Sequence, residues 1–157
     1  EEDHHFYDYL RDNVNMVVIP SLNIDGFLQT QANPQFSYMM SDPNDPTYSP
    51  RDGRMRRKNM LGADEDFYTT MDHLNGVDLN RNNNPFWASD PDRASPDLDS
   101  IVHYGASPAS EPEIQALDTA AQLGPAERLR LSTDVHSFSL GHFWARNDSN
   151  RLASQTE

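Results

Sequence analysis

Three short groups of residues have types and spacings that could do chemistry. The first is residues 134–137 (DVHS), in which His136 stands near the end of an apolar stretch. A histidine that ends a buried strand can ligate zinc through one ring nitrogen. The same pattern is also typical of a histidine that only makes structural hydrogen bonds. Taken alone, this second interpretation is the more common one.

The other two groups carry arginines. Residues 76–82 (GVDLNRN) place Asn80 beside Arg81, and an arginine fork with an adjacent amide can bind a carboxylate through parallel N–H bonds. Residues 54–58 (RMRRK) form the one basic cluster in a chain of net charge −13. An arginine in such a cluster can face a developing oxyanion. Each group alone also fits ordinary surface charges paired with acidic neighbours.

The elements that must position these groups are predicted strands and helices. Residues 14–22 (VNMVVIPSL) are short, β-branched and almost continuously apolar, which predicts a buried strand, and residues 131–138 (LSTDVHSF) predict another. Residues 110–113 (SEPE) fit a capping box with proline in the first turn, and predict a helix that runs to about Leu123. Strands combined with helices favour an α/β fold.

The remaining segments are predicted to connect these elements. Residues 1–13 are interpreted as the end of a helix, and residues 23–26 (NIDG) as a turn. Residues 29–53 and 83–100 are rich in proline and acidic residues, and predict two long polar loops. In open α/β sheets, ligands bind beyond the carboxyl ends of strands. His136 and residues 23–26 both have such a place in the predicted order.

Composition narrows the function classes. The chain has 157 residues, of which 36% are hydrophobic, and it contains no cysteine. No apolar run approaches the roughly 20 residues of a membrane span. The strongly acidic balance disfavours a nucleic acid as partner. The absence of cysteine excludes disulfides and thiolate metal sites within the chain.

Taken together, the groups resemble the zinc carboxypeptidases of the M14 (carboxypeptidase A/B-like) family. The blocks that carry the resemblance are residues 19–27 (IPSLNIDGF), 54–59 (RMRRKN), 76–82 (GVDLNRN), 104–113 (YGASPASEPE) and 134–137 (DVHS). Ile24 stands where the family has proline, and Arg56 stands where it has tryptophan. The resemblance implies a mixed, mostly parallel sheet flanked by helices. It also implies that residues 1–157 form the central part of a single catalytic domain.

The resemblance further implies a role for each matching residue. His136 would be a zinc ligand, and Arg57 would polarise the scissile carbonyl and stabilise the oxyanion. A shift of the alignment would move that second role to Arg54 or Arg56. The implied substrate is the C-terminus of a peptide or protein, whose terminal carboxylate Asn80 and Arg81 would bind. Asp78 would orient a zinc-binding histidine. Ser137 and Phe138 would line the cleft beside the metal.

Several alternatives stay open at this point. The chain could belong to a non-catalytic module that binds peptide C-termini, or to a related enzyme for glutamylated or cell-wall peptides. The acidic residues of the second loop could bind calcium, although their spacing does not match an EF-hand; they are Asp90, Asp92, Asp97 and Asp99. Secretion or a periplasmic location is implied by the family, and a cytoplasmic enzyme stays open. The oligomeric state is not readable.

The sequence generates one prediction about zinc. The family's His-x-x-Glu motif is absent from these residues, so His136 is one of the three protein ligands that a catalytic zinc requires. We therefore expect the 157-residue chain to bind zinc weakly or not at all in isothermal titration calorimetry. Submicromolar, stoichiometric binding that His136→Ala abolishes would contradict the interpretation of the chain as a fragment.

Overall fold

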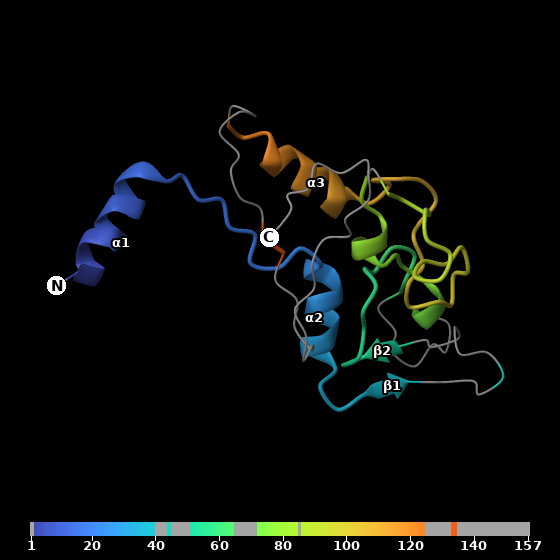
Figure 1. Cartoon of the computed structure of the whole chain (residues 1–157). Helices are drawn as coiled ribbons and strands as arrows, with labels where there is room; N and C mark the ends of the chain where they lie inside the picture. The colour runs from blue at the N-terminus through green and yellow to red at the C-terminus, as the bar shows by residue number, and fades with distance from the viewer. Residues whose placement is uncertain are drawn as a thin grey trace. The chain divides into compact units, whose positions relative to one another are not determined.

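The computed structural model describes a set of segments that together make up most of the chain (Figure 1). These segments are residues 2–39, 44, 51–64, 72–84, 86–124 and 133–134. The chain divides into two compact units, residues 1–124 and 125–157. All the helices and strands described below belong to the first unit. The predicted strand 131–138 lies, apart from residues 133–134, outside the described residues, and the single domain over 1–157 stays a prediction.

The first unit contains helices, short 3-10 turns and one strand pair. The elements in chain order are α1 (Glu2–Asn13), α2 (Ile24–Ala32), β1 (Ser37–Met39), β2 (Arg51–Gly53), η1 (Asp72–Leu74), η2 (Leu79–Arg81) and α3 (Pro112–Ala121). The two strands are antiparallel, with Tyr38 opposite Asp52. The helix expected within residues 1–13 is confirmed as α1.

Helix α2 begins where the sequence predicted only a turn. The side chain of Asn23 accepts a hydrogen bond from the Gly26 amide at 3.1 Å, which caps the helix, and Asp25 lies in its first turn. Asn and Asp are favoured both in turns and at helix N-termini, because their side chains satisfy nearby backbone N–H groups. The buried side of α2 carries Gly26 and Gln29, three residues apart.

Helix α3 confirms the predicted helix, with a different cap. Pro112 occupies the first turn, where its missing N–H costs nothing. The residue at the N-cap is Glu111 and not Ser110, and its side chain makes no capping hydrogen bond. The Ser110 hydroxyl instead donates to the Glu111 carboxylate at 2.7 Å. Ile114 is completely buried and anchors the helix to the unit.

The predicted strand 14–22 is not present, and this prediction was wrong. Val14 and residues 16–19 are exposed, and no backbone ladder joins them to another described segment. An apolar, β-branched run becomes a strand only when a neighbouring strand supplies hydrogen bonds to its backbone. Among the described residues, the single sheet is the antiparallel pair β1–β2. The mostly parallel sheet is therefore not found in this part of the chain.

The two predicted loops differ in the structure. The interval 29–53 contains the end of α2 and both strands, so it is a strand pair with a connection and not a continuous loop. The described residues of 83–100 contain no helix or named strand, and are held by turns and by one isolated bridge between Ser95 and His103. Proline and acidic residues therefore marked the second loop correctly.

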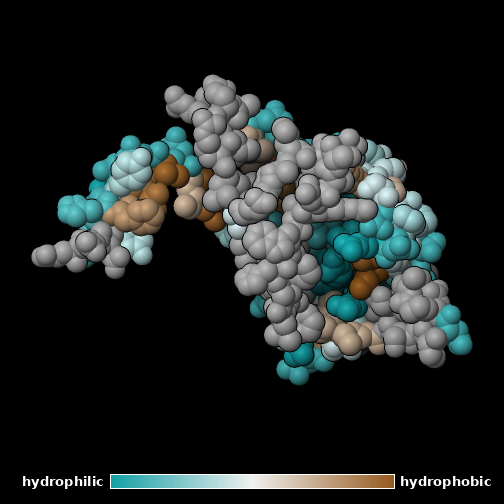
Figure 2. All heavy atoms as spheres, in the orientation of Figure 1, coloured by the Kyte–Doolittle hydropathy of each residue, from teal (hydrophilic) through white to brown (hydrophobic). Residues whose placement is uncertain are grey.

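The interior that the described residues of the first unit form is mainly polar. Among them, the buried hydrophobic residues are Val77, Leu79, Ala94 and Ile114. Twelve polar or charged residues are buried beside them: Gln29, Asp52, Arg56, Lys58, Asn59, Asp72, His73, Asp78, Asn82, Ser100, His103 and Glu111. Hydrophobic side chains are instead exposed along α1 and the segment after it (Figure 2). No described helix has the length and apolar character needed to span a bilayer.

Gly76 offers a direct test of this packing. Its backbone has a φ of +86°, and a Cβ at this position would collide with the carbonyl oxygen of Asn59 and crowd the guanidinium of Arg56. We expect Gly76→Ala to lower the free energy of unfolding by at least about 2 kcal/mol in urea denaturation. Gly124 is the matched control, because no atom of the described residues lies within 4 Å of the place that its Cβ would take. Gly124→Ala should change the same quantity by less than about 0.5 kcal/mol, and equal effects would contradict this account.

Candidate active site

The centre of the candidate site is the ion pair between Arg57 and Asp78. The Nε and Nη2 atoms of Arg57 donate to Oδ2 of Asp78 at 3.0 and 2.9 Å. The other carboxylate oxygen, Oδ1, accepts the backbone N–H of Asn80 at 3.2 Å. The Asp78 side chain is 5% exposed, whereas that of Arg57 is 35% exposed. A buried carboxylate therefore orients a guanidinium that still reaches solvent.

The sequence explains how Asp78 comes to this place. Asp78 caps η2, and its own amide donates to the carbonyl of His103 at 2.9 Å. Val77 and Leu79, on either side of it, are buried. Because the flanking apolar residues anchor the backbone, the Asp78 carboxylate is held at the start of η2. The predicted carboxylate-binding pair follows in the same turn, after Leu79.

That pair is Asn80 and Arg81. Asn80 is exposed at the first turn of η2. The guanidinium of Arg81 donates from Nε to the carbonyl of Arg93 at 2.6 Å and from Nη1 to that of Asn80 at 3.1 Å. Its Nη2 atom makes no hydrogen bond with the residues that the structure describes. The structure thus brings Arg57, Asp78, Asn80 and Arg81 together in one connected group.

The N-terminus of α2 holds the segment that carries Arg57. Asn23 donates from Nδ2 to the Arg57 carbonyl at 3.1 Å, and Asp25 accepts the Met60 amide at 2.9 Å. Gly26 lies so close that a Cβ would stand 2.8 Å from the carbonyl oxygen of Lys58. Residues 23–26 therefore fix the backbone of residues 57–60, a role that sequence reasoning did not predict.

Asn59 makes a second set of structural hydrogen bonds that the sequence did not predict. Its Oδ1 accepts the Val77 amide at 2.7 Å, and its Nδ2 donates to Glu111 at 2.7 Å and to Glu113 at 3.3 Å. Its own amide donates to the Val77 carbonyl at 3.0 Å. Asn59 thus joins three of the blocks that carry the resemblance. Its position inside the block 54–59 was the one sequence feature that could have indicated this role.

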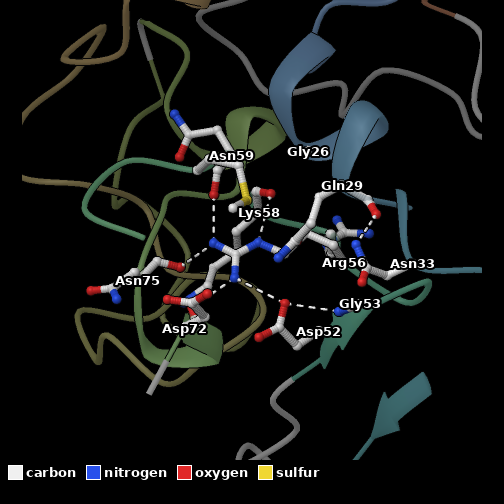
Figure 3. A network of polar contacts seen from close by, with 12 residues as sticks. Gly26, Gln29, Asn33, Asp52, Gly53, Arg56, Lys58, Asn59, Asp72 and Asn75 are labelled. Carbon is white, nitrogen blue, oxygen red and sulfur yellow. Dashed lines mark hydrogen bonds and ion pairs between the residues drawn. The ribbon is translucent and has the colours of Figure 1, made fainter. Parts of the chain in front are cut away.

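The three arginines of the basic cluster have different environments. Arg54 is exposed, and the Arg56 side chain is completely buried. All the N–H groups of Arg56 point at acceptors of this chain, as Figure 3 shows for several of them. Burial lowers the pKa of Arg56, and the Asp52 carboxylate opposes that effect. Arg57 is therefore the member of this cluster that is both oriented by a carboxylate and accessible.

Other buried ionisable groups surround the site. Burial lowers the pKa of Lys58 to about 8, and its Nζ donates to the Leu98 carbonyl. Burial also lowers the pKa of His73 and of His103. Burial raises the pKa of the Asp72 carboxyl. The interior around the site therefore favours the neutral form of each of these side chains.

The described residues form no metal centre. Among them, no group of three or more histidine or carboxylate side chains is arranged to hold a metal ion. His136, Ser137 and Phe138 lie outside the described residues, so their roles stay predictions. In the loop with the acidic residues, Asp90 accepts the Asp92 amide at 3.2 Å and pairs with Arg93 at 3.6 Å. The described residues thus do not fit a zinc site by themselves.

The motifs that meet in this site are those of a metalloprotease. The chain therefore belongs to a class of hydrolases whose catalytic domain has an α/β fold. It belongs to the zinc carboxypeptidase family, peptidase M14: the family model of that description matches residues 2–157. This match confirms the resemblance found in the motifs. A search among curated proteins gives no match.

The buried Lys58 generates a prediction about pH. Its pKa is about 8 in the folded state and 10.5 ordinarily. Between these values the unfolded chain binds a proton that the folded protein has released, so the free energy of unfolding should rise with pH. We expect the wild type to gain about 1–3 kcal/mol over this window relative to Lys58→Met, measured by urea denaturation at each pH. A difference that is flat across the window would contradict the lowered pKa of Lys58.

Proposed function

We propose that this chain is part of a zinc-dependent metallocarboxypeptidase that removes C-terminal residues from peptides, with metal-activated water as the nucleophile. Arg57 would stabilise the oxyanion, and Asn80 and Arg81 would bind the terminal carboxylate. His136 is proposed as a zinc ligand, with Ser137 and Phe138 lining the cleft. The observation that carries the proposal is the Asp78 carboxylate, because one of its oxygens holds Arg57 and the other caps the turn with Asn80 and Arg81.

The geometry of Arg57 suits an oxyanion. Two of its nitrogens are bound to one buried oxygen of Asp78, so the plane of the guanidinium has a defined orientation. The Nη1 atom makes no hydrogen bond with described residues, and the side chain is partly exposed. A donor that is oriented before the substrate arrives stabilises developing charge without reorganisation at the moment of reaction. These features support the role proposed for Arg57.

The pair on η2 suits recognition of a free carboxylate. An exopeptidase has to distinguish a chain terminus from an internal peptide bond, and a guanidinium with an adjacent amide does so by charge and by paired N–H donors. Arg81 is anchored through Nε and Nη1, which leaves Nη2 for a ligand. Asp78 as a support for a zinc-binding histidine remains part of the proposal, beside the Arg57 contact that the structure gives it.

The first prediction from this proposal concerns catalysis. In the full-length protein, Arg57→Gln should lower kcat for release of C-terminal residues by about 10²–10³, because it removes an oxyanion donor. The matched control is Arg54→Gln, since Arg54 belongs to the same cluster but is exposed. The control should keep the wild-type kcat. An unchanged kcat in Arg57→Gln would overturn the role proposed for Arg57.

The second prediction concerns recognition of the terminus. Arg81→Gln should raise KM by about 10- to 100-fold, since a charge-assisted hydrogen bond contributes about 1.5–3 kcal/mol. Peptides with an amidated C-terminus should bind the wild type as poorly as acid peptides bind the variant. If the full-length protein binds acid peptides in this Arg81-dependent way but releases no residues, the non-catalytic binding module is the correct function. A panel of glutamylated and cell-wall peptides decides between enzyme specificities.

A further inference from the structure

The Arg56 side chain is the most fully coordinated group among the described residues. Its Nη1 donates to the Asp72 carbonyl at 2.6 Å and to the Asp52 carboxylate at 3.4 Å. Its Nη2 donates to the carbonyls of Asn59 at 2.7 Å and Asn75 at 2.9 Å. Nε donates to the Lys58 carbonyl at 3.2 Å. Since arginine has five N–H groups, this set uses its whole donor capacity, and none is left for a substrate.

Four of these five acceptors, the backbone carbonyls, belong to two segments that both enter the candidate site. The carbonyls of Lys58 and Asn59 directly follow Arg57, and those of Asp72 and Asn75 precede residues 77–81 by a few positions. Figure 3 shows the guanidinium between the two segments. The two segments also bond to each other through Asn59 and Val77. Arg56 therefore lies at the place where the backbone of one half of the site is joined to that of the other.

We propose that Arg56 is a positioning residue for the site. It would not touch the substrate, and would act by holding the segment with Arg57 in register with the segment that carries Asp78, Asn80 and Arg81. This inference rests on the proposed function for its effect on catalysis, and on the hydrogen bonds alone for its effect on the backbone. It assigns a role to the one residue of the basic cluster that departs from the family pattern.

The chemistry of the site requires arginine in particular. Lysine supplies a point charge with three donors and cannot reach acceptors spread over the plane of a guanidinium. Glutamine supplies two donors and no charge, and would leave the buried Asp52 carboxylate without its partner. Lysine is close to arginine in length, whereas glutamine is shorter and leaves space where the guanidinium lay. Both substitutions remove the planar fork, so effects that the two variants share come from its loss and not from the change in volume.

A double-mutant cycle in the full-length protein tests the effect on catalysis. Arg56→Gln should lower kcat per folded molecule by at least about tenfold, and Arg56→Lys should not restore it. In an Arg57→Gln background, the same Arg56 substitution should lower kcat by less than about threefold, because the group it positions is gone. Ile114→Ala is the control for destabilisation alone, since Ile114 is a buried apolar residue that takes part in none of the hydrogen bonds of Arg56; it should leave kcat per folded molecule unchanged.

Hydrogen exchange provides a readout that does not depend on activity. In Arg56→Gln and Arg56→Lys, the amides of Asn59 and Val77 should exchange at least about tenfold faster, while the amides of α3 keep their wild-type rates. Exchange that accelerates equally in α3 would show general destabilisation and overturn the proposal. Unchanged exchange at Asn59 and Val77 would overturn it as well. An equal loss of kcat in both backgrounds would show that Arg56 does not act through Arg57.

The two readouts separate the failure of this inference from the failure of the proposed function. If the wild type releases no C-terminal residues, the proposed function fails, and hydrogen exchange still decides whether Arg56 joins the two segments. If the wild type is active and Arg57→Gln is impaired, but Arg56→Gln has wild-type kcat, the proposed function stands and the positioning role is wrong.

Discussion

The buried guanidinium of Arg56 is the interaction on which the rest of the described unit depends. Removing a charge from water is costly unless hydrogen bonds and a counter-charge replace its hydration. Arg56 meets this requirement with four backbone carbonyls and the Asp52 carboxylate. Because four of the five acceptors are backbone, the constraint acts on the path of the chain. Neither segment can move without leaving part of a buried charge unsatisfied.

The same physics applies to the other buried polar residues. Asn59, Asp78 and Asn82 each bond to backbone groups of distant segments. Few hydrophobic residues are buried among those that the structure describes, so apolar packing contributes little to the order of this part of the unit. Directional hydrogen bonds take that place, and a fully satisfied network specifies one arrangement because a shifted one would strand its members. A site that needs oriented donors is thus built from the network that orders the fold.

The sequence predicted some of these features and missed others for identifiable reasons. Local signals were sufficient for α3, since Pro112 in its first turn and Gly124 after its end are read within one element. The helix expected within residues 1–13 also forms, as α1. The apolar run 14–22 was interpreted as a strand, although strands depend on partners that a single segment does not reveal. The site residues Arg57, Asp78, Asn80 and Arg81 were found from motif order. The roles of Asn59 and Arg56 were missed, because they consist of contacts between distant segments, to a backbone amide and two carboxylates for Asn59 and mainly to backbone carbonyls for Arg56. Residue type alone does not reveal such contacts.

The replacement at position 56 shows how scaffold and site are coupled. A tryptophan, which the resemblance expects there, has one N–H donor and needs an apolar cavity. The surroundings in this chain are the opposite: converging carbonyls, and a carboxylate four residues earlier at Asp52. The carbonyl of Asn75 precedes Gly76, whose positive φ lets the turn approach Asn59 and Arg56 closely. A tryptophan at this position would leave those acceptors buried and unpaired, so Arg56, Asp52 and Gly76 make sense only as a set. The departure from the family pattern is therefore matched by its environment, while the orientation of the neighbouring Arg57 comes from the Asp78 carboxylate.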